Sequence, residues 1–139
     1  MRGSRTIALA AAVTVLSLAL AACAPSPDDV RREALDAYVE AERGTIPALL
    51  SSLPGMYSSL EISGEIAAEV DSAAVIYFTY IYARTVESEA GQAQLKQACE
   101  TQLFPAIRQA GVTGPVRVFY TFLQPSEEVS WDVTCTSAG

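Results

Sequence analysis

The chain has 139 residues, is 50% hydrophobic and carries a formal net charge of −7 without a single histidine. This length suits one domain with a core of its own. The acidic balance argues against a nucleic-acid partner, because nucleic-acid binding requires a basic surface. Without histidine the chain lacks the commonest general base and the commonest metal ligand. We therefore expect no metal, no other cofactor and no nucleic-acid partner.

Residues 1–22 have the layout of a secretory signal. Arg2 and Arg5 precede an apolar stretch from Ile7 to Leu20. That stretch is shorter than the roughly 20 residues that cross a bilayer. It ends in Leu20-Ala21-Ala22-Cys23, which resembles the bacterial lipobox. The resemblance implies that the Cys23 thiol takes a diacylglycerol group and that residues 1–22 are removed.

Two acyl chains on Cys23 give stable membrane anchoring, whereas one chain is marginal. We therefore expect residues 23–27 to form a lipidated tether and residues 28–139 a single α+β domain on the extracytoplasmic side of the cell membrane. Two alternatives stay open: a permanent transmembrane anchor, and ordinary cleavage that leaves Cys23 unmodified. Sixteen acidic and seven basic residues follow residue 22, a net charge of −9, so the domain should stand away from an anionic leaflet.

Residues 26–53 predict a helix or a pair of helices. Ser26 suits an N-cap, and Pro27 suits the first helical position. Apolar residues then recur at helical spacing, with interruptions at Gly44 and Pro47. We expect a kinked helix, or two consecutive ones, that ends before Pro54.

The remaining pattern predicts four strands and a second helix that Pro105 kinks. The expected strands are 56–66, 74–83, 116–123 and 129–136, with the helix over about 88–110. The order is thus α-β-β-α-β-β. It predicts an antiparallel sheet of about four strands with helices packed on one face.

Both remaining cysteines lie on apolar faces. Cys135 shares one face of its strand with Val129, Trp131 and Val133, and Cys99 belongs to a helical stripe of spacing four. In an exported domain this favours a Cys99–Cys135 disulfide, although two buried thiols remain an alternative. Closing the loop between them is worth about 4 kcal/mol in the chain-entropy model. The expected role is structural.

The sheet face turned away from the helices is more apolar than a solvated face requires. Tyr77, Thr79, Arg117 and Phe119 lie on it and form our candidate binding face. The alternative is that these hydrophobic residues are ordinary scattered surface positions.

Carboxylates are the only plentiful reactive groups. Acids cluster at Glu65, Glu69 and Asp71 and again at Glu127-Glu128. A hydrolase needs two carboxylates across a cleft, and a calcium site needs a regular ligand rhythm. Neither pattern stands out, and we expect no enzymatic activity.

The stretch from Ile62 to Thr136 is similar to an uncharacterised family of extracytoplasmic domains in lipoproteins of Gram-positive bacteria. The matching features are the strand Val75-Ile76-Tyr77-Phe78-Thr79-Tyr80, the helix after it, and the hairpin opened by Val116-Arg117-Val118-Phe119-Tyr120. The family's usual Asp-Gly hairpin turn is replaced by Gln124-Pro125-Ser126-Glu127. The resemblance implies fold and location only.

Together these features predict a non-enzymatic binding or interaction module at the cell envelope. The expected partners are the membrane, through the lipid on Cys23, and an envelope protein or a small ligand. The alternatives are a structural or accessory envelope lipoprotein without a small ligand, and a hydrolase that uses carboxylates.

Overall fold

A computed structural model describes residues 24–68, 72–86 and 91–139 of the chain. Residues 1–23 lie outside the described residues, and with them the expected signal and the lipidation site Cys23. The chain divides into two units, Met1–Val30 and Arg31–Gly139. The packing described below is that of the second unit.

Helix α2 spans Pro27–Ser52 and is one uninterrupted helix with Pro47 inside it. The Asp29 N–H donates to Ser26 Oγ at 3.2 Å, which confirms Ser26 as the cap. Pro47 removes one helical hydrogen bond, but Ile46 and Leu49 pack against the core on both sides of it and hold the helix in place. The expected end before Pro54 is confirmed.

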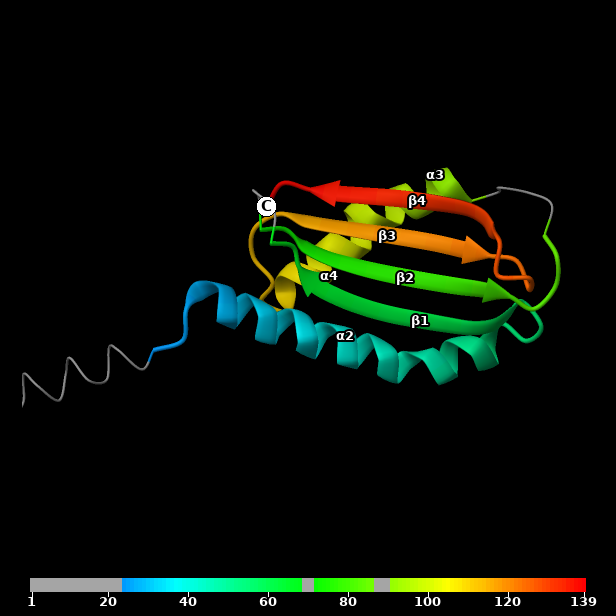
Figure 1. Cartoon of the computed structure of the whole chain (residues 1–139), viewed down its shortest axis with the longest axis horizontal. Coiled ribbons are helices and arrows are strands. Elements are labelled where there is room, and N and C mark those ends of the chain that lie inside the picture. The colour runs from blue at the N-terminus through cyan, green and yellow to red at the C-terminus, as the bar shows by residue number, and fades with distance from the viewer. Residues whose placement is uncertain (1–23, 69–71, 87–90) are drawn as a thin grey trace, which may run out of the picture. The chain divides into compact units, whose positions relative to one another are not determined.

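Four strands form one sheet in the order β1-β2-β3-β4 (Figure 1). Their bounds are Tyr57–Ile66 for β1, Ala74–Tyr82 for β2, Val116–Leu123 for β3 and Val129–Ser137 for β4. The α+β class and the order α-β-β-α-β-β are confirmed.

The sheet is mixed, so the prediction of an antiparallel sheet is wrong in one pairing. β1–β2 and β3–β4 are antiparallel, but β2 and β3 run parallel, with Ala74 opposite Val116. The helical segment between β2 and β3 explains this. Its residues 92–109 would cover about 27 Å, close to the length of an eight-residue strand. The helix therefore returns the chain to the end where β2 began.

The second helical segment contains a π turn. It consists of α3 (Gln92–Ala98), the π-helical η1 (Cys99–Leu103) and α4 (Phe104–Gln109). The Phe104 N–H bonds to the Cys99 carbonyl, five residues back. The widened turn stands directly before Pro105, which has no N–H and would crowd the carbonyl four residues earlier. The expected disturbance at Pro105 thus takes the form of a π turn.

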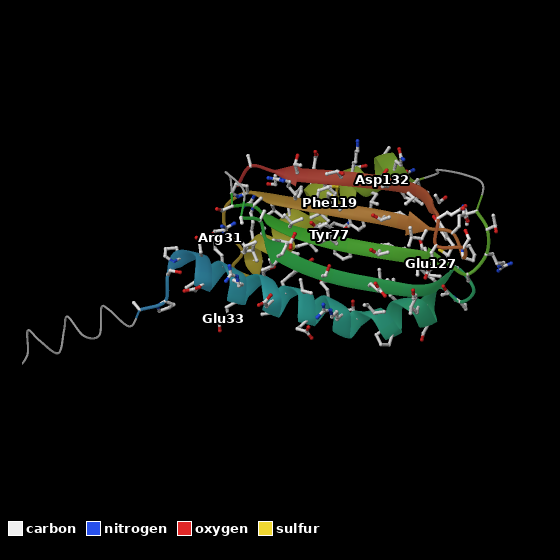
Figure 2. All side chains as sticks on the ribbon, in the orientation of Figure 1. Arg31, Glu33, Tyr77, Phe119, Glu127 and Asp132 are labelled. Atoms are coloured by element: carbon white, nitrogen blue, oxygen red, sulfur yellow. A yellow bond between two sulfur atoms is a disulfide. The ribbon has the colours of Figure 1, made fainter. Side chains whose placement is uncertain are left out.

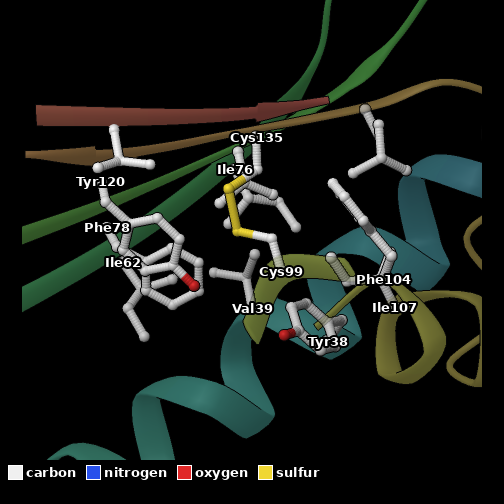
Figure 3. Close-up of a cluster of buried hydrophobic side chains, with 14 of the residues drawn as sticks. Tyr38, Val39, Ile62, Ile76, Phe78, Cys99, Phe104, Ile107, Tyr120 and Cys135 are labelled. Atoms are coloured by element: carbon white, nitrogen blue, oxygen red, sulfur yellow. A yellow bond between two sulfur atoms is a disulfide. The ribbon is translucent and has the colours of Figure 1, made fainter. Parts of the chain in front are cut away.

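The core lies between the sheet and the helices, and the disulfide crosses it (Figure 3). Cys99 of η1 and Cys135 of β4 are bonded, with their Cα atoms 6.3 Å apart. Both are buried, as are Ile76 and Ile107 beside them. The predicted disulfide is confirmed. The expected strand faces also hold, except that Val129 at the start of β4 is 64% exposed.

Helix α2 approaches β1 closely because Gly64 has no side chain. A Cβ on Gly64 would lie 2.9 Å from Val39 Cγ2 and 3.3 Å from Leu35 Cγ. Arg43 of α2 also donates to the Ile62 carbonyl of β1 at 3.0 Å. These contacts fix α2 along β1.

Candidate functional site

The candidate binding face is the side of the sheet opposite the core. Residues alternate across each strand, so the neighbours of buried Ile76 and Val118 point away from the helices. Tyr77 and Phe119 occupy the middle of this open face, as Figure 2 shows. They are in register on β2 and β3, and their rings stack with centroids 5.4 Å apart.

Tyr77 is the most accessible large side chain described at the centre of this face. It is 37% exposed, and its hydroxyl hydrogen-bonds to Glu65 Oε1 at 3.0 Å. The stack against Phe119 on one side and the bond to Glu65 on the other hold the ring in one orientation. A rigid amphipathic ring of this kind loses little entropy when a partner covers it.

The structure brings the four residues of the candidate face together. Thr79 follows Tyr77 by two residues on β2, and Arg117 precedes Phe119 by two on β3. All four therefore point to the same side of two adjacent strands. Their common face is thus observed, while their role in binding stays a prediction.

Charge surrounds the aromatic pair. Glu61 and Glu65 lie on β1, opposite Thr79 and Val75 respectively. Asp132 lies on β4, opposite Thr121. The face therefore has an apolar centre with carboxylates on both outer strands, and Arg117 is its basic side chain.

A groove of about 510 Å³ adjoins this face between α2 and β1. Tyr77 and Thr79 form part of its lining, and Arg43, Ile46 and Pro47 line it from α2. Arg43 also pairs with Glu40 at the surface. The groove extends the open face beyond the edge of the sheet.

A second hollow, which the sequence analysis missed, lies at the end of the sheet where β2 and β3 finish. This end pocket measures about 840 Å³, and its walls include Tyr57, Tyr82, Phe122 and Trp131. The alternation pattern assigned Tyr82, Phe122 and Trp131 to the helix-facing side, where the structure buries them. It could not show that these rings border a hollow. The sequence signal that could have indicated the pocket is the cluster of four aromatic residues at the strand ends.

Three tyrosines gather around Glu42 at a smaller cavity between α2 and η1. Tyr38, Tyr80 and Tyr120 line it, and Tyr38 hydrogen-bonds to Glu42. Burial raises the pKa of Tyr80 to about 12 and also raises the pKa values of Tyr38 and Tyr120. Nearby Glu42 adds to each rise, because its charge disfavours a phenolate. These hydroxyls are therefore protonated at neutral pH and cannot act as bases.

Among the acidic residues considered for hydrolysis or calcium binding, the structure describes Glu65, Glu127 and Glu128, and Glu65 lies far along the sheet from the other two. Glu65 lies at the end of β1 that pairs with the start of β2, whereas Glu127 and Glu128 lie in the β3–β4 connection at the other end. Glu69 and Asp71 lie outside the described residues. Within the described part of the chain, no cluster of three or more His, Cys, Asp or Glu residues could hold a metal ion.

The described helices include none with the length and apolar character needed to cross a membrane. Comparison with protein-family models, with curated proteins and with solved structures finds no match to this chain.

Proposed function

We propose that this chain is a lipid-anchored, extracytoplasmic binding module that recognises another protein of the cell envelope through the open face of its sheet. The observation that carries the proposal is the Tyr77–Phe119 stack, with Tyr77 37% exposed at the centre of that face. Aromatic side chains and arginine are the residues that most often dominate protein interfaces. Arg117 supplies an arginine on the same face.

The proposal favours a protein partner over a small ligand at this face. A sheet face is broad, and its apolar centre is ringed by charged and hydroxyl side chains, which is the usual anatomy of a protein interface. The adjoining groove between α2 and β1 gives a protruding side chain of the partner a place to insert. Small ligands prefer enclosed pockets.

The location is part of the proposal and rests on the sequence. The signal-like residues 1–22 and the lipobox-like tetrad support a lipid on Cys23. The Cys99–Cys135 disulfide supports an oxidising compartment, because disulfides persist in exported proteins. The substitution Cys23→Ser in the full chain tests the lipid anchor. The variant should carry no lipid and should not be retained in the membrane. Persistence of the lipid and of membrane retention would contradict the anchor.

The binding face is tested by crosslinking in intact cells with the full-length chain. We expect Tyr77→Ser with Phe119→Ser to abolish crosslinks to the partner, since the pair supplies the apolar centre. Val129→Ser is the matched control, because Val129 is 64% exposed but lies outside the stack. Unfolding curves establish that both variants fold. Unchanged crosslinking by the folded double variant would refute this face.

A further inference from the structure

We propose that the end pocket is a second binding site, and that it takes a small carboxylate with an apolar body. The site is separate from the open face, since its floor is the helix-facing side of the sheet. It therefore adds a small-molecule ligand to the protein partner proposed above.

The pocket floor is a cluster of aromatic rings. Phe122 and Trp131 stack with centroids 3.8 Å apart, and Tyr57 stacks on Tyr82 at 5.3 Å. The Trp131 indole N–H donates to the Tyr82 hydroxyl at 3.0 Å, which links the two pairs. The rings are thus fixed by one another and offer a rigid apolar surface before any ligand arrives.

The walls come from two other parts of the chain. Pro54 and Met56 contribute from the α2–β1 connection, and Leu95 and Ala98 contribute from α3. The Ala83 N–H bonds to the Met56 carbonyl at 3.0 Å and ties the first wall to the end of β2. The volume of about 840 Å³ lies within the range of small-molecule sites.

The Gln124 side chain fixes the segment after β2 that borders the pocket. Its Oε1 accepts from the Val86 N–H at 3.0 Å, and its Nε2 donates to the Val86 carbonyl at 2.7 Å. The same amide group donates to Ser130 Oγ at 3.1 Å. This segment is therefore held to the β3–β4 hairpin by two hydrogen bonds, and it carries Arg84 at the rim.

Arg84 determines the charge of the ligand. It is the one charged side chain among the described lining residues, and its guanidinium lies over Gly55, where an added Cβ would be 3.3 Å from Nη2. Arg84 is exposed and forms no hydrogen bond or ion pair with the residues that the structure describes. A cation above an apolar, aromatic floor is complementary to a molecule with an apolar body and a carboxylate at one end.

The test uses 4-phenylbutyrate and its uncharged amide on the full-length protein. Trp131 is the chain's single tryptophan, so its fluorescence and its one indole N–H resonance report on the pocket directly. We expect a saturable change with both compounds and a dissociation constant about three- to fivefold lower for the carboxylate, as a rim ion pair provides. The dissociation constants of octanoate and 4-phenylbutyrate, compared with each other, show whether the pocket floor prefers an aliphatic or an aromatic ligand body.

Arg84→Gln should raise the dissociation constant of 4-phenylbutyrate to that of the amide. The dissociation constant of the amide should stay unchanged. Arg32→Gln is the matched control, because Arg32 is an exposed arginine of α2 that does not line the pocket. The absence of a saturable Trp131 response to any of the three compounds would overturn the site. Equal affinities for carboxylate and amide in the unmodified protein would overturn the role of Arg84. Neither outcome alters the crosslinking test of the open face.

Discussion

The two faces of the sheet are built from the same strands, yet their environments are opposite. On β2, Ile76 is fully buried beneath the helices, while its neighbour Tyr77 on the other side is 37% exposed. On β3, Val118 is fully buried, while Phe119 beside it is half-buried and stacked on Tyr77. One face holds the core and the disulfide, and the other has no described helix packed across it.

This difference separates two demands on the side chains of a single strand. The core face depends on close packing, so its side chains cannot change without a cost in folding free energy. Side chains of the open face have fewer partners to lose. Side chains on that face can therefore vary while the fold is preserved.

The largest expected effect comes from removing the disulfide on the core face. Replacing Cys99 and Cys135 together by alanine should lower the free energy of unfolding by about 4 kcal/mol, because the unfolded chain regains the freedom of a long loop. Urea unfolding of the variant and of the oxidised protein measures this. An unchanged midpoint would show that packing alone closes this part of the core.

A matched pair of isoleucines on β2 compares the two faces directly. Ile76→Ala should cost about 3 kcal/mol, since it leaves a cavity in a fully buried site. Ile81→Ala removes the same atoms from a half-buried position on the open face. It should cost less than about 1.5 kcal/mol. Equal losses in urea unfolding would contradict the division between the faces.

Alkaline pH should weaken the core face through its tyrosines. Burial raises the pKa of Tyr80 to about 12, above the ordinary value of 10.0. Between these values the unfolded chain loses the proton while the folded protein keeps it, so stability is complete below pH 10 and falls as the pH rises to about 12. The loss for Tyr80 is at most about 3 kcal/mol.

Tyr80→Phe removes this titration and should flatten the decline in urea midpoints between about pH 10 and pH 12. If the urea midpoint of Tyr80→Phe falls with pH as steeply as that of the unmodified protein, the raised pKa of Tyr80 is contradicted.

The smallest expected effect is an increase in stability at the β3–β4 turn, away from both faces. The Glu127 N–H bonds to the Gln124 carbonyl at 2.8 Å, and Glu127 has a φ of 67°. Glycine adopts this left-handed conformation without steric cost, so Glu127→Gly should stabilise the protein by about 1 kcal/mol. Thermal unfolding measures the shift, and a lower melting temperature would contradict the local strain.

Side-chain alternation predicted much of the fold. β3 begins and ends at the predicted residues, and β4 extends one residue beyond its prediction. The grouping of Tyr77, Thr79, Arg117 and Phe119 on one face also follows from alternation alone. In the helix, the spacing of Cys99 and Leu103 indicated the buried stripe but not the π turn between them.

The alternation of side chains could not predict two features of the structure, for physical reasons. Alternation is the same for parallel and antiparallel strands, so it could not reveal that β2 and β3 run in the same direction. Burial patterns also describe which way a side chain points, not how far a helix extends over it. The rings of Phe122 and Trp131 were therefore assigned to the core, although they also border the end pocket.

The parallel pairing of β2 with β3 has a consequence for the order in which the chain folds. Each hairpin can close locally, but Ala74 meets Val116 only after the whole intervening helical segment has been placed. Contacts so distant in sequence carry a large loop-closure cost and slow folding. The centre of the sheet therefore forms only once β3 is available to pair with β2. Until then, β2 presents an unpaired edge on which a chaperone can act.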